Sequence, residues 1–509
     1  MKSDFLRLWF RRGLKFLLFA IVVVVTLLVL AGSVISYQGR REWAATKREL
    51  LAKGEKLSLV ELAPPGIPDE MNFFADPLWE EIVMKARKPG ENPMHGGEPA
   101  VAREKQQLAV LLQPLPKVEV EALRRKYPLF AGKLLDNTTA SGVTLGLWGK
   151  AREHDATWRG ELVRYTLDVY QPAEPVLDRV VQLLERPAAR FPVNYEEGFF
   201  ASLPHITALI ALGQAFQQRA YAELQLGQSE RARRDALAII GLSHTVRAEP
   251  LLISYLVRSS LLSMAAKVVE TGVGAHAWSD EDLVAMERAL REEDLLPGLA
   301  QSLRGERGGF NAIMETLRSG NLEPYGVIIG MQDGERHPSG WLVNLPAGLY
   351  LKIFGLSDQA YENRYTQKQI EMVTAWPNVT AQQDDFAKLM ANQTFRFTHL
   401  FSALTIPTWL SVFNRAALTQ TIVVQARIAC ALERYYLKHL EYPKTLEALV
   451  PEYLSAVPVD IVNGQPMHYE RTSAGAFKLW SIGVDGKDDQ GRAAEKHRLH
   501  DGDWVWGAM

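Results

Sequence analysis

The feature that most constrains the fold is an uncharged apolar run near the N-terminus, residues 16–37. Twenty-two residues in an α-helix span about 33 Å, enough to cross the hydrocarbon core of a bilayer. Basic side chains outnumber the single acidic one in the segment before it, which contains Lys2, Asp4, Arg7, Arg11, Arg12 and Lys15. We therefore predict a cytoplasmic tail over residues 1–15 and a transmembrane helix over residues 16–37.

A secretory signal sequence has the same layout, and Ala31-Gly32-Ser33 offers a cleavage site. The run is longer than the apolar part of a typical cleaved signal, which favours an uncleaved anchor. Orientation is less constrained, because basic residues also follow the run, at Arg40, Arg41, Lys47 and Arg48. The short tail, with its charges next to the helix, favours a cytoplasmic N-terminus, since long following domains translocate largely regardless of charge.

Residues 38–100 are expected to form an exposed helix followed by a strap rich in proline and glycine. The helix-compatible part, residues 38–59, is highly charged. Three prolines between residues 64 and 68 then exclude a helix. The strap either lies on the later domain through aromatic side chains or acts as a flexible spacer; these aromatic residues are Phe73, Phe74 and Trp79.

Residues 101–413 are expected to form a large helical domain. Apolar residues recur at helical spacing over 206–224 and 232–243, separated by a break at Gly227, with Ser229 as a candidate cap. Small residues on these stripes resemble one tetratricopeptide-type hairpin, but no clean 34-residue repeat establishes a solenoid. Further helices are predicted over 251–271, 280–293 and 295–318.

Two parts of this domain have weaker helical patterns. Residues 320–360 are rich in glycine and proline and are predicted to be irregular. Residues 400–413 are apolar, but Pro407 is expected to interrupt them, which leaves the segment too short for a second membrane span.

The last segment, residues 414–509, carries ordered short motifs. A helix from Arg427 to Lys438 is followed by Tyr442-Pro443, by Val457-Pro458-Val459-Asp460, by Ser481-Ile482-Gly483-Val484-Asp485-Gly486 and by Asp503-Trp504. This order resembles the C-terminal domain of the major pseudopilin of type II secretion. The resemblance implies a small α+β domain with a helix packed on a short antiparallel sheet. The expected core residues are Tyr435, Tyr442, Leu449, Leu454, Tyr469, Phe477 and Leu479.

Acidic side chains gather in the final loop, and they are Asp485, Asp488, Asp489, Asp501 and Asp503. Carboxylate oxygens on a glycine-containing loop suit calcium, which takes six to eight oxygen ligands. The resemblance implies a calcium ion held by the side chains of Asp485 and Asp503 and by the backbone carbonyls of Ile482 and Trp504. The loop over residues 487–500 is longer and more basic than that of the family. A solvated acidic loop without an ion therefore remains the alternative.

This chain also departs from a pilin subunit. The prepilin-peptidase signature that opens the apolar run of pilins is absent, and the run is far from the pseudopilin-like segment. A pilin joins the two by one continuous helix. We therefore do not expect this protein to be processed or packed as a fibre subunit.

Other chemistry has little support in the sequence. The net charge of −2 shows no basic excess, so nucleic acid is not an expected partner. The single cysteine, Cys430, rules out an internal disulfide and is expected to be buried rather than reactive. We find no catalytic or nucleotide-binding motif.

Two further groups of polar residues are expected to have no site chemistry. His497 and His500 form a close pair, but no third soft ligand for a transition metal lies near them. The charged residues at 304–307 and 384–385 are expected to be solvated faces or caps.

The predicted fold is mostly α: an N-terminal transmembrane helix, a large helical domain and a small C-terminal α+β domain. The expected function is that of a non-enzymatic, membrane-anchored scaffold that binds an unidentified protein and is linked to a secretion or pilus-like system. The resemblance places it in a bacterial inner membrane, single-pass, with its C-terminal bulk in the periplasm. The alternative is an envelope enzyme whose site is assembled from dispersed residues of the helical domain. A long exposed groove favours the binding protein, and a pocket of buried carboxylates or histidines favours the enzyme.

Overall fold

The structure is a computed structural model that describes residues 2–80, 109–112, 117–133, 144, 146–320, 348–374, 398–473, 475–494 and 502–508. The chain is mostly helical, as predicted, and the strands of the described part form one three-stranded sheet. Two compact units are distinguished. Unit 1 comprises Met1–Glu61, Arg307–Gln369 and Asp384–Trp409, and unit 2 comprises Leu62–Glu306, Ile370–Gln383 and Leu410–Met509.

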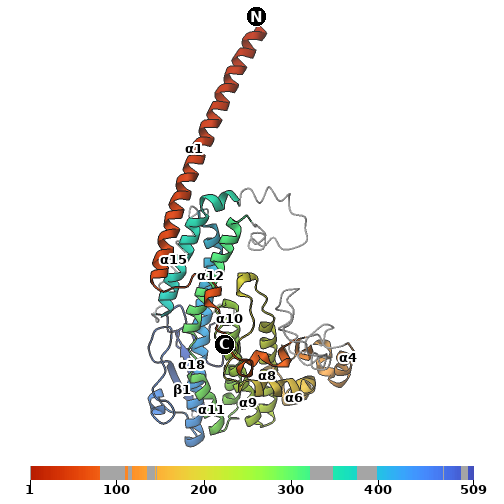
Figure 1. Ribbon diagram of the computed structural model, residues 1–509. Helices are drawn as coiled ribbons and strands as arrows, with labels where there is room; N and C mark the ends of the chain where they lie inside the picture. Colours follow the sequence, from red (N-terminus) through yellow and green to blue (C-terminus); the bar gives the residue numbers. More distant parts are fainter. Residues whose placement is uncertain are drawn as a thin grey trace. The chain divides into compact units, whose positions relative to one another are not determined.

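Helix α1 (Lys2–Ala52) is the most prominent feature of unit 1 (Figure 1). It is long and apolar enough to cross a membrane. Apolar side chains of the run stand uncovered by protein, with Phe16 75% and Leu28 66% exposed. Helix α10 (Leu252–Gly274) also meets the length and composition criteria, but 61% of its apolar window is buried inside unit 2. Protein packing therefore accounts for the apolar character of α10.

The second half of α1 packs along other helices of unit 1, so the expectation of an exposed helix over 38–59 is wrong for one of its faces. Thr46 and Leu50 are buried. Gly39 permits a close approach, because an added Cβ there would lie 3.0 Å from the backbone nitrogen of Ser357. Ser357 belongs to α15 (Gly355–Thr374), which lies beside α1 in Figure 1.

Helix α15 begins inside the range predicted to be irregular, and residues 348–353 before it are helical too. Its buried face is largely polar, so the apolar spacing that marks a packed helix is missing. Asn311 on α12 (Leu296–Arg318) occupies the centre of this polar network. Its side-chain amide donates to the Leu57 carbonyl at 3.0 Å, and its oxygen accepts from Asn363 at 2.8 Å.

Arg307 corrects a second expectation, since it is not on a solvated face. Its side chain is only 1% exposed. It donates to Glu55 at 2.5 Å and to Gln367 at 2.8 Å, both within unit 1. A buried guanidinium needs such partners, because an unpaired buried charge is costly.

Helix α18 (Leu400–His439) runs without interruption through Pro407, contrary to the sequence prediction. Its first turn is held by Asp358 of α15, whose carboxylate accepts from the backbone nitrogens of Phe401 at 2.9 Å and Ser402 at 3.1 Å. A carboxylate at a helix N-terminus satisfies free N–H groups and suits the helix dipole. The proposed boundary between residues 413 and 414 therefore falls within one continuous helix.

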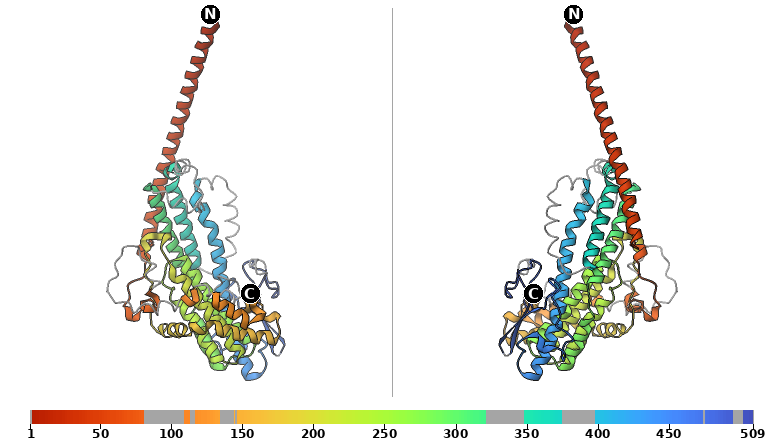
Figure 2. Two further views of the ribbon diagram at one scale, coloured as in Figure 1. Left: turned by 90° about the vertical axis from the view of Figure 1, so that its right-hand side faces the viewer. Right: turned by 90° about the vertical axis from the view of Figure 1, so that its left-hand side faces the viewer.

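Unit 2 contains a set of packed helices (Figure 2). These are α3 (Ala109–Leu112), α4 (Lys117–Lys126), α6 (Ala156–Tyr170), α7 (Glu174–Leu183), α8 (Pro204–Gln225), α9 (Ser229–His244), α10 and α11 (Asp280–Arg291). Helices α8 and α9 form the predicted hairpin. Gly213 of α8 allows α10 to approach, because an added Cβ would lie 2.4 Å from Leu261. Ser279 and Asp282 form a capping box at the start of α11.

Short 3₁₀ helices connect these elements. They are η1 (Val60–Leu62), η2 (Asp69–Met71), η3 (Phe73–Ala75), η4 (Pro77–Trp79), η7 (Pro128–Lys133), η8 (Ala151–Glu153), η9 (Gln171–Ala173), η10 (Tyr195–Phe200) and η11 (Leu446–Leu449).

The segment over residues 72–79 packs onto unit 2 as a strap rather than hanging as a spacer. Its backbone pairs with residue 188, where the Phe73 nitrogen donates to the Ala188 carbonyl at 2.9 Å. Phe73, Phe74 and Trp79 are all buried, and the Phe74 ring meets Phe191 edge-on with a centroid distance of 5.3 Å. The remaining part of the predicted strap, residues 81–100, lies outside the described residues.

The last part of unit 2 places the end of α18 on a small antiparallel sheet. Its strands are β1 (His468–Ser473), β2 (Ala476–Ser481) and β3 (Trp504–Val505), in the order β1-β2-β3. Tyr469 lies opposite Leu479, and Ser481 lies opposite Trp504. A hydrophobic cluster joins this helix end to the sheet, and four of the seven predicted core residues, Tyr442, Leu449, Leu454 and Leu479, are buried in it. The other three, Tyr435, Tyr469 and Phe477, are partly buried and pack against the cluster. Cys430 is fully buried, as expected, and burial raises the pKa of its thiol.

Candidate functional site

Two of the predicted calcium ligands, Asp485 and Asp503, lie in the loops that follow β2 and precede β3. The Asp485 carboxylate accepts from the backbone nitrogens of Lys487 at 3.1 Å and Gly502 at 3.3 Å. The Asp503 carboxylate is fully buried and accepts from the backbone nitrogens of Asp489 at 3.2 Å and Gly491 at 2.6 Å. Loss of hydration raises the pKa of Asp503. Both carboxylates therefore organise the loop backbone.

One of the predicted carbonyl ligands, that of Trp504, is hydrogen-bonded inside the protein. The carbonyl of Trp504 accepts from the side-chain amide of Gln425 on α18 at 2.7 Å, inside the protein. The backbone nitrogen of Ile482 donates to Asp460 at 3.3 Å, so a further buried carboxylate lies beside this loop. Among the residues that the structure describes, no group of three or more His, Cys, Asp or Glu side chains is placed to hold a metal. Asp501, His497 and His500 lie outside the described residues.

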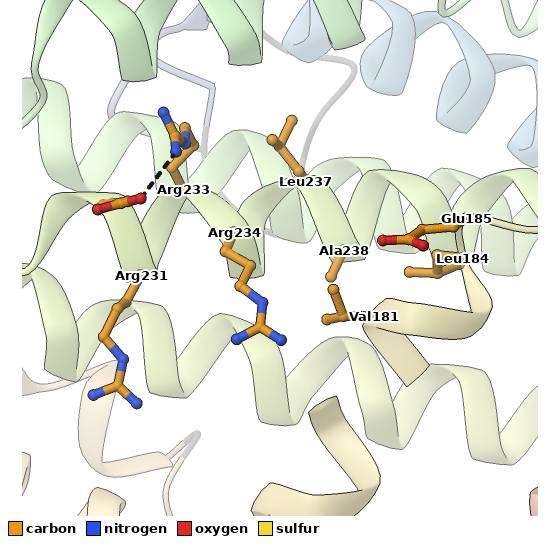
Figure 3. Close-up of a pocket in the computed structure, with 9 residues that line it drawn as sticks. Val181, Leu184, Glu185, Arg231, Arg233, Arg234, Leu237 and Ala238 are labelled. Carbon is orange, nitrogen blue, oxygen red and sulfur yellow. Dashed lines mark ion pairs between the residues drawn. The ribbon is translucent and has the colours of Figure 1, made fainter. Parts of the chain in front are cut away.

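A second candidate site lies on the helices of unit 2, where a pocket of about 620 Å³ opens between α7 and α9 (Figure 3). We call it the arginine groove. Its walls combine an apolar part with charged side chains, and they comprise Val181, Leu184, Leu237, Ala238, Glu185, Glu230, Arg231, Arg233 and Arg234. Figure 3 shows Arg231 and Arg234 extending from the same side of α9. The groove thus offers an apolar surface beside clustered guanidinium groups.

The helical spacing of α9 explains why these charges gather. Ala232, Asp235 and Ala236 are buried, whereas Arg231 and Arg234, three positions apart, are exposed on the opposite side of the helix. Arg234 pairs with Asp178 of α7 at 3.0 Å, and its side chain is 49% exposed. Arg231 pairs with Glu223 at 3.4 Å, and its side chain is 62% exposed. The Arg234–Asp178 pair is exposed on both sides and contributes about 0–1 kcal/mol, so Arg234 can exchange this partner for another carboxylate. The Glu223 partner of Arg231 is only 3% exposed, although the Arg231 side chain itself reaches solvent.

A buried charge cluster lies beside the groove. Arg219 donates two hydrogen bonds to Asp235, at 2.7 and 2.6 Å. Glu223 is almost completely buried near this pair. Loss of hydration and the neighbouring Asp235 charge raise the pKa of Glu223 to about 7. As the pH falls through 7, Glu223 takes up a proton and Arg231 loses an ionic partner.

This arrangement predicts a pH-dependent stability effect of Glu223→Gln. The folded state binds the Glu223 proton more tightly than the unfolded state between about pH 4.5 and pH 7, so the stability that Glu223 contributes falls as the pH rises through that window. We expect the glutamine variant to match the wild type near pH 4 and to exceed it by about 3 kcal/mol near pH 8. Urea unfolding of both proteins at the two pH values measures the difference. A stability difference that does not change with pH would contradict this assignment.

A third arrangement joins the α10–α11 loop to α18. His276 Nδ1 lies 2.8 Å from a carboxylate oxygen of Glu433, and the hydroxyl of Tyr442 donates to the other oxygen at 2.6 Å. The imidazole ring of His276 stacks on the ring of Tyr436, with a centroid distance of 4.3 Å. Glu433 is fully buried, whereas the His276 side chain is 38% exposed. In the tautomer that donates from Nδ1 to this carboxylate, Nε2 is the acceptor nitrogen of the ring. His276 also has a φ of 50°, in the left-handed region that few residues other than glycine adopt.

Sequence reasoning found neither the arginine groove nor the pairing of His276 with Glu433. The groove has a local signal, three arginines within four positions after Glu230. The His276–Glu433 pair has a weaker local signal, because Glu433 is a single acidic residue that follows the apolar Ala431 and Leu432 of a helix. Its partner is 157 residues away in the chain, so spacing could not identify it. Comparisons of the chain with protein-family models, with curated proteins and with solved structures gave no match.

Proposed function

We propose that this protein is a single-pass membrane protein whose extracytoplasmic part binds other proteins, and that the arginine groove receives an acidic, partly apolar segment of a partner. The observation that carries this proposal is the combination of an apolar wall with exposed arginines in one pocket of about 620 Å³. The apolar helix α1, long enough to cross a membrane, supports the anchoring.

The recognition chemistry follows from the walls of the groove. Apolar side chains of the partner would cover Leu184 and Leu237, which are half-buried in the free protein. Carboxylates of the partner would meet Arg231 and Arg234, since a guanidinium group binds a carboxylate through two parallel hydrogen bonds. Arginine is also enriched among the residues that dominate binding energy at protein interfaces.

Selection of peptides tests this recognition directly. We expect a random peptide library displayed on phage, panned against the detergent-solubilised full-length protein, to be enriched in sequences that combine Asp or Glu with Leu or Phe. The double variant Arg231→Glu/Arg234→Glu should weaken binding of the selected peptides about tenfold or more, because it replaces attraction by repulsion. The control Arg247→Glu changes an exposed arginine that is not among the lining residues of the groove, and should leave binding unchanged. Equal binding to the double variant would refute the assignment of the groove.

The cellular setting is the part of the proposal that rests on the resemblance of residues 427–504 to a pseudopilin domain. On this basis we propose a bacterial inner-membrane protein with its bulk in the periplasm, linked to a secretion or pilus-like system. A periplasm-dependent reporter fused after Met509 should be active, and a cytoplasm-dependent reporter at the same position should be inactive. The reverse pattern would contradict the orientation.

Calcium in the final loop is a separate proposal, which the same resemblance supports. Binding to the folded state would stabilise the protein by about 2.7 kcal/mol at a hundredfold excess over the dissociation constant. We therefore expect the full-length protein to melt at a higher temperature in calcium than in chelator, and Asp485→Ala to abolish the difference. Asp488→Ala is the control, because Asp488 has no counterpart in the ligand set. Equal melting temperatures in calcium and in chelator would contradict calcium binding. The carboxylates of the loop would then serve only to accept hydrogen bonds from its backbone N–H groups.

The alternative, an envelope enzyme, is favoured by the ordered His276–Glu433–Tyr442 arrangement, since carboxylate-oriented histidines serve as general bases. Such an activity would depend on His276. A screen of chromogenic esters and glycosides with the wild type and His276→Ala tests it. Turnover by the wild type that the variant lacks would favour the enzyme over the binding protein.

A further inference from the structure

Residues 348–354 of unit 1 lie beside the apolar part of α1. An added Cβ at Gly32 would lie 3.3 Å from the Cδ1 atom of Ile353. Further along, Ser357 Oγ donates to Glu42 at 2.8 Å, and Arg364 donates to Thr46 at 3.1 Å. Residue numbers rise together in these three contacts, so α1 and the segment from 353 to 364 run in the same direction.

This register fixes the depth of the segment relative to the apolar run. Gly32 lies five residues before Tyr37, the last residue of the run, which corresponds to about 7.5 Å along the helix. Residues 348–353 form a separate helical piece that ends in a turn at Phe354, so the contact with Gly32 fixes the level of Ile353. Ile353 is therefore level with apolar residues of α1, about 7.5 Å inside the end of the run.

The chemistry of the segment suits that depth. The Leu349 side chain is 57% exposed, and Ile353 and Phe354 are half-buried. The inner side of the segment packs in an apolar cluster with α12 and α18, formed by Phe310, Ile313, Met314, Leu317, Leu351 and Phe401. The single charged residue over 348–354 is Lys352, which is exposed and can extend its ammonium group toward lipid headgroups.

The helices of unit 1 change from apolar to polar at about the level where α1 does. Beyond Tyr37, α1 carries Arg40, Arg41 and Glu42. Buried polar contacts of unit 1 at this level and beyond include those of Thr46 and Glu55. Within the segment, the hydroxyl of Tyr350 donates to Asp358 of α15 at 2.7 Å. A bundle whose tip is apolar inside and partly apolar outside, and whose remainder is polar, matches the change from hydrocarbon to interface.

We propose that residues 348–354 form a tip of unit 1 that is embedded in the extracytoplasmic leaflet of the bilayer, beside α1. The occupant of the exposed Leu349 surface is lipid, because this surface continues the lipid-facing surface of the anchor. The inference rests on the proposed membrane anchoring of α1. It adds that the folded bundle itself enters the membrane instead of standing above it on a stalk.

A lipid-sensitive probe on the full-length protein tests the proposal. Leu349→Cys is labelled with an environment-sensitive fluorophore and the protein is reconstituted in vesicles of phosphatidylcholine and phosphatidylglycerol. The native Cys430 is fully buried, so it leaves the labelling specific. We expect blue-shifted emission, quenched several-fold more by lipids with a nitroxide on a shallow acyl carbon than for Leu51→Cys. Leu51 is the matched control, because it is 50% exposed on α1 beyond the apolar run.

A label at Val25→Cys, in the middle of the run, separates the two levels of the proposal. If Val25 is quenched by lipid and Leu349 behaves like Leu51, the anchor stands and the embedded tip is refuted. If neither Val25 nor Leu349 is quenched, the anchoring itself fails and the tip fails with it. Blue-shifted emission at Leu349 without quenching by lipid would indicate a second copy of the chain on this surface, which also overturns the proposal.

Discussion

Deleting residues 2–38 should release the protein from the membrane. The full-length chain should remain in the membrane fraction through an alkaline carbonate wash, because the run from Phe16 to Tyr37 presents uncovered apolar side chains along a helix long enough to cross. The contacts of unit 1 that involve Glu42, Thr46 and Glu55 remain in the truncated protein. We therefore expect it to fold and to appear in the soluble fraction.

The embedded tip does not change this expectation. A few exposed apolar residues bind a membrane weakly, since even a single myristoyl chain gives marginal and reversible binding. The truncated protein still contains α10, the other helix that is long and apolar enough to cross a membrane. Its release therefore shows that α10 does not hold the protein in the membrane. If the truncated protein stayed in the membrane through the wash, α10 or the apolar segment over residues 400–413 would have to insert, and the single-pass topology would be wrong.

The replacement Trp79→Ala should destabilise unit 2 by about 3–5 kcal/mol. Trp79 is fully buried, and its ring lies against those of Phe73 and Phe74, with centroid distances of 5.1 and 4.9 Å. Truncation removes these contacts and leaves a cavity beneath the strap. Denaturant unfolding of the full-length protein, monitored by far-UV circular dichroism, measures this decrease in the free energy of unfolding.

Met71→Ala is the matched control for the strap. The Met71 side chain is 40% exposed, and the contact of this residue with Ala188 is made by its backbone carbonyl. We expect a change within about 0.5 kcal/mol, as for other surface substitutions. If Trp79→Ala were as mild as Met71→Ala, the segment would behave as a spacer in solution, the alternative that the sequence left open.

The sequence was most informative where the chain follows local rules. Helices α10, α11 and α12 were predicted to within a few residues, because their apolar spacing and the Ser279 cap are local features. The core around α18 and the small sheet was also expected, here from the resemblance of the last segment to a pseudopilin domain rather than from local spacing. Burial of Cys430 followed from its apolar neighbours on one helix.

The sequence was least informative where polar groups satisfy each other across the chain. Helix α15 buries Asp358, Gln359 and Asn363, so no apolar stripe marked it. Arg307 finds its acid partner, Glu55, 252 residues earlier. The arginine groove depends on the side-by-side placement of α7 and α9, and helical spacing within either one does not reveal it. Such pairings are set by tertiary structure, which local propensity does not encode.

The most direct measurement of the central claim is site-specific photo-crosslinking from the arginine groove in the native membrane. A benzophenone side chain at Leu237 is activated in the full-length protein, and the linked peptide is identified by mass spectrometry. We expect a partner protein whose linked segment is acidic and partly apolar, with an adduct yield that falls about tenfold in Arg231→Glu/Arg234→Glu and is unchanged in Arg247→Glu. An adduct whose yield is the same in the double variant, or a linked segment without acidic residues, would contradict the proposed function.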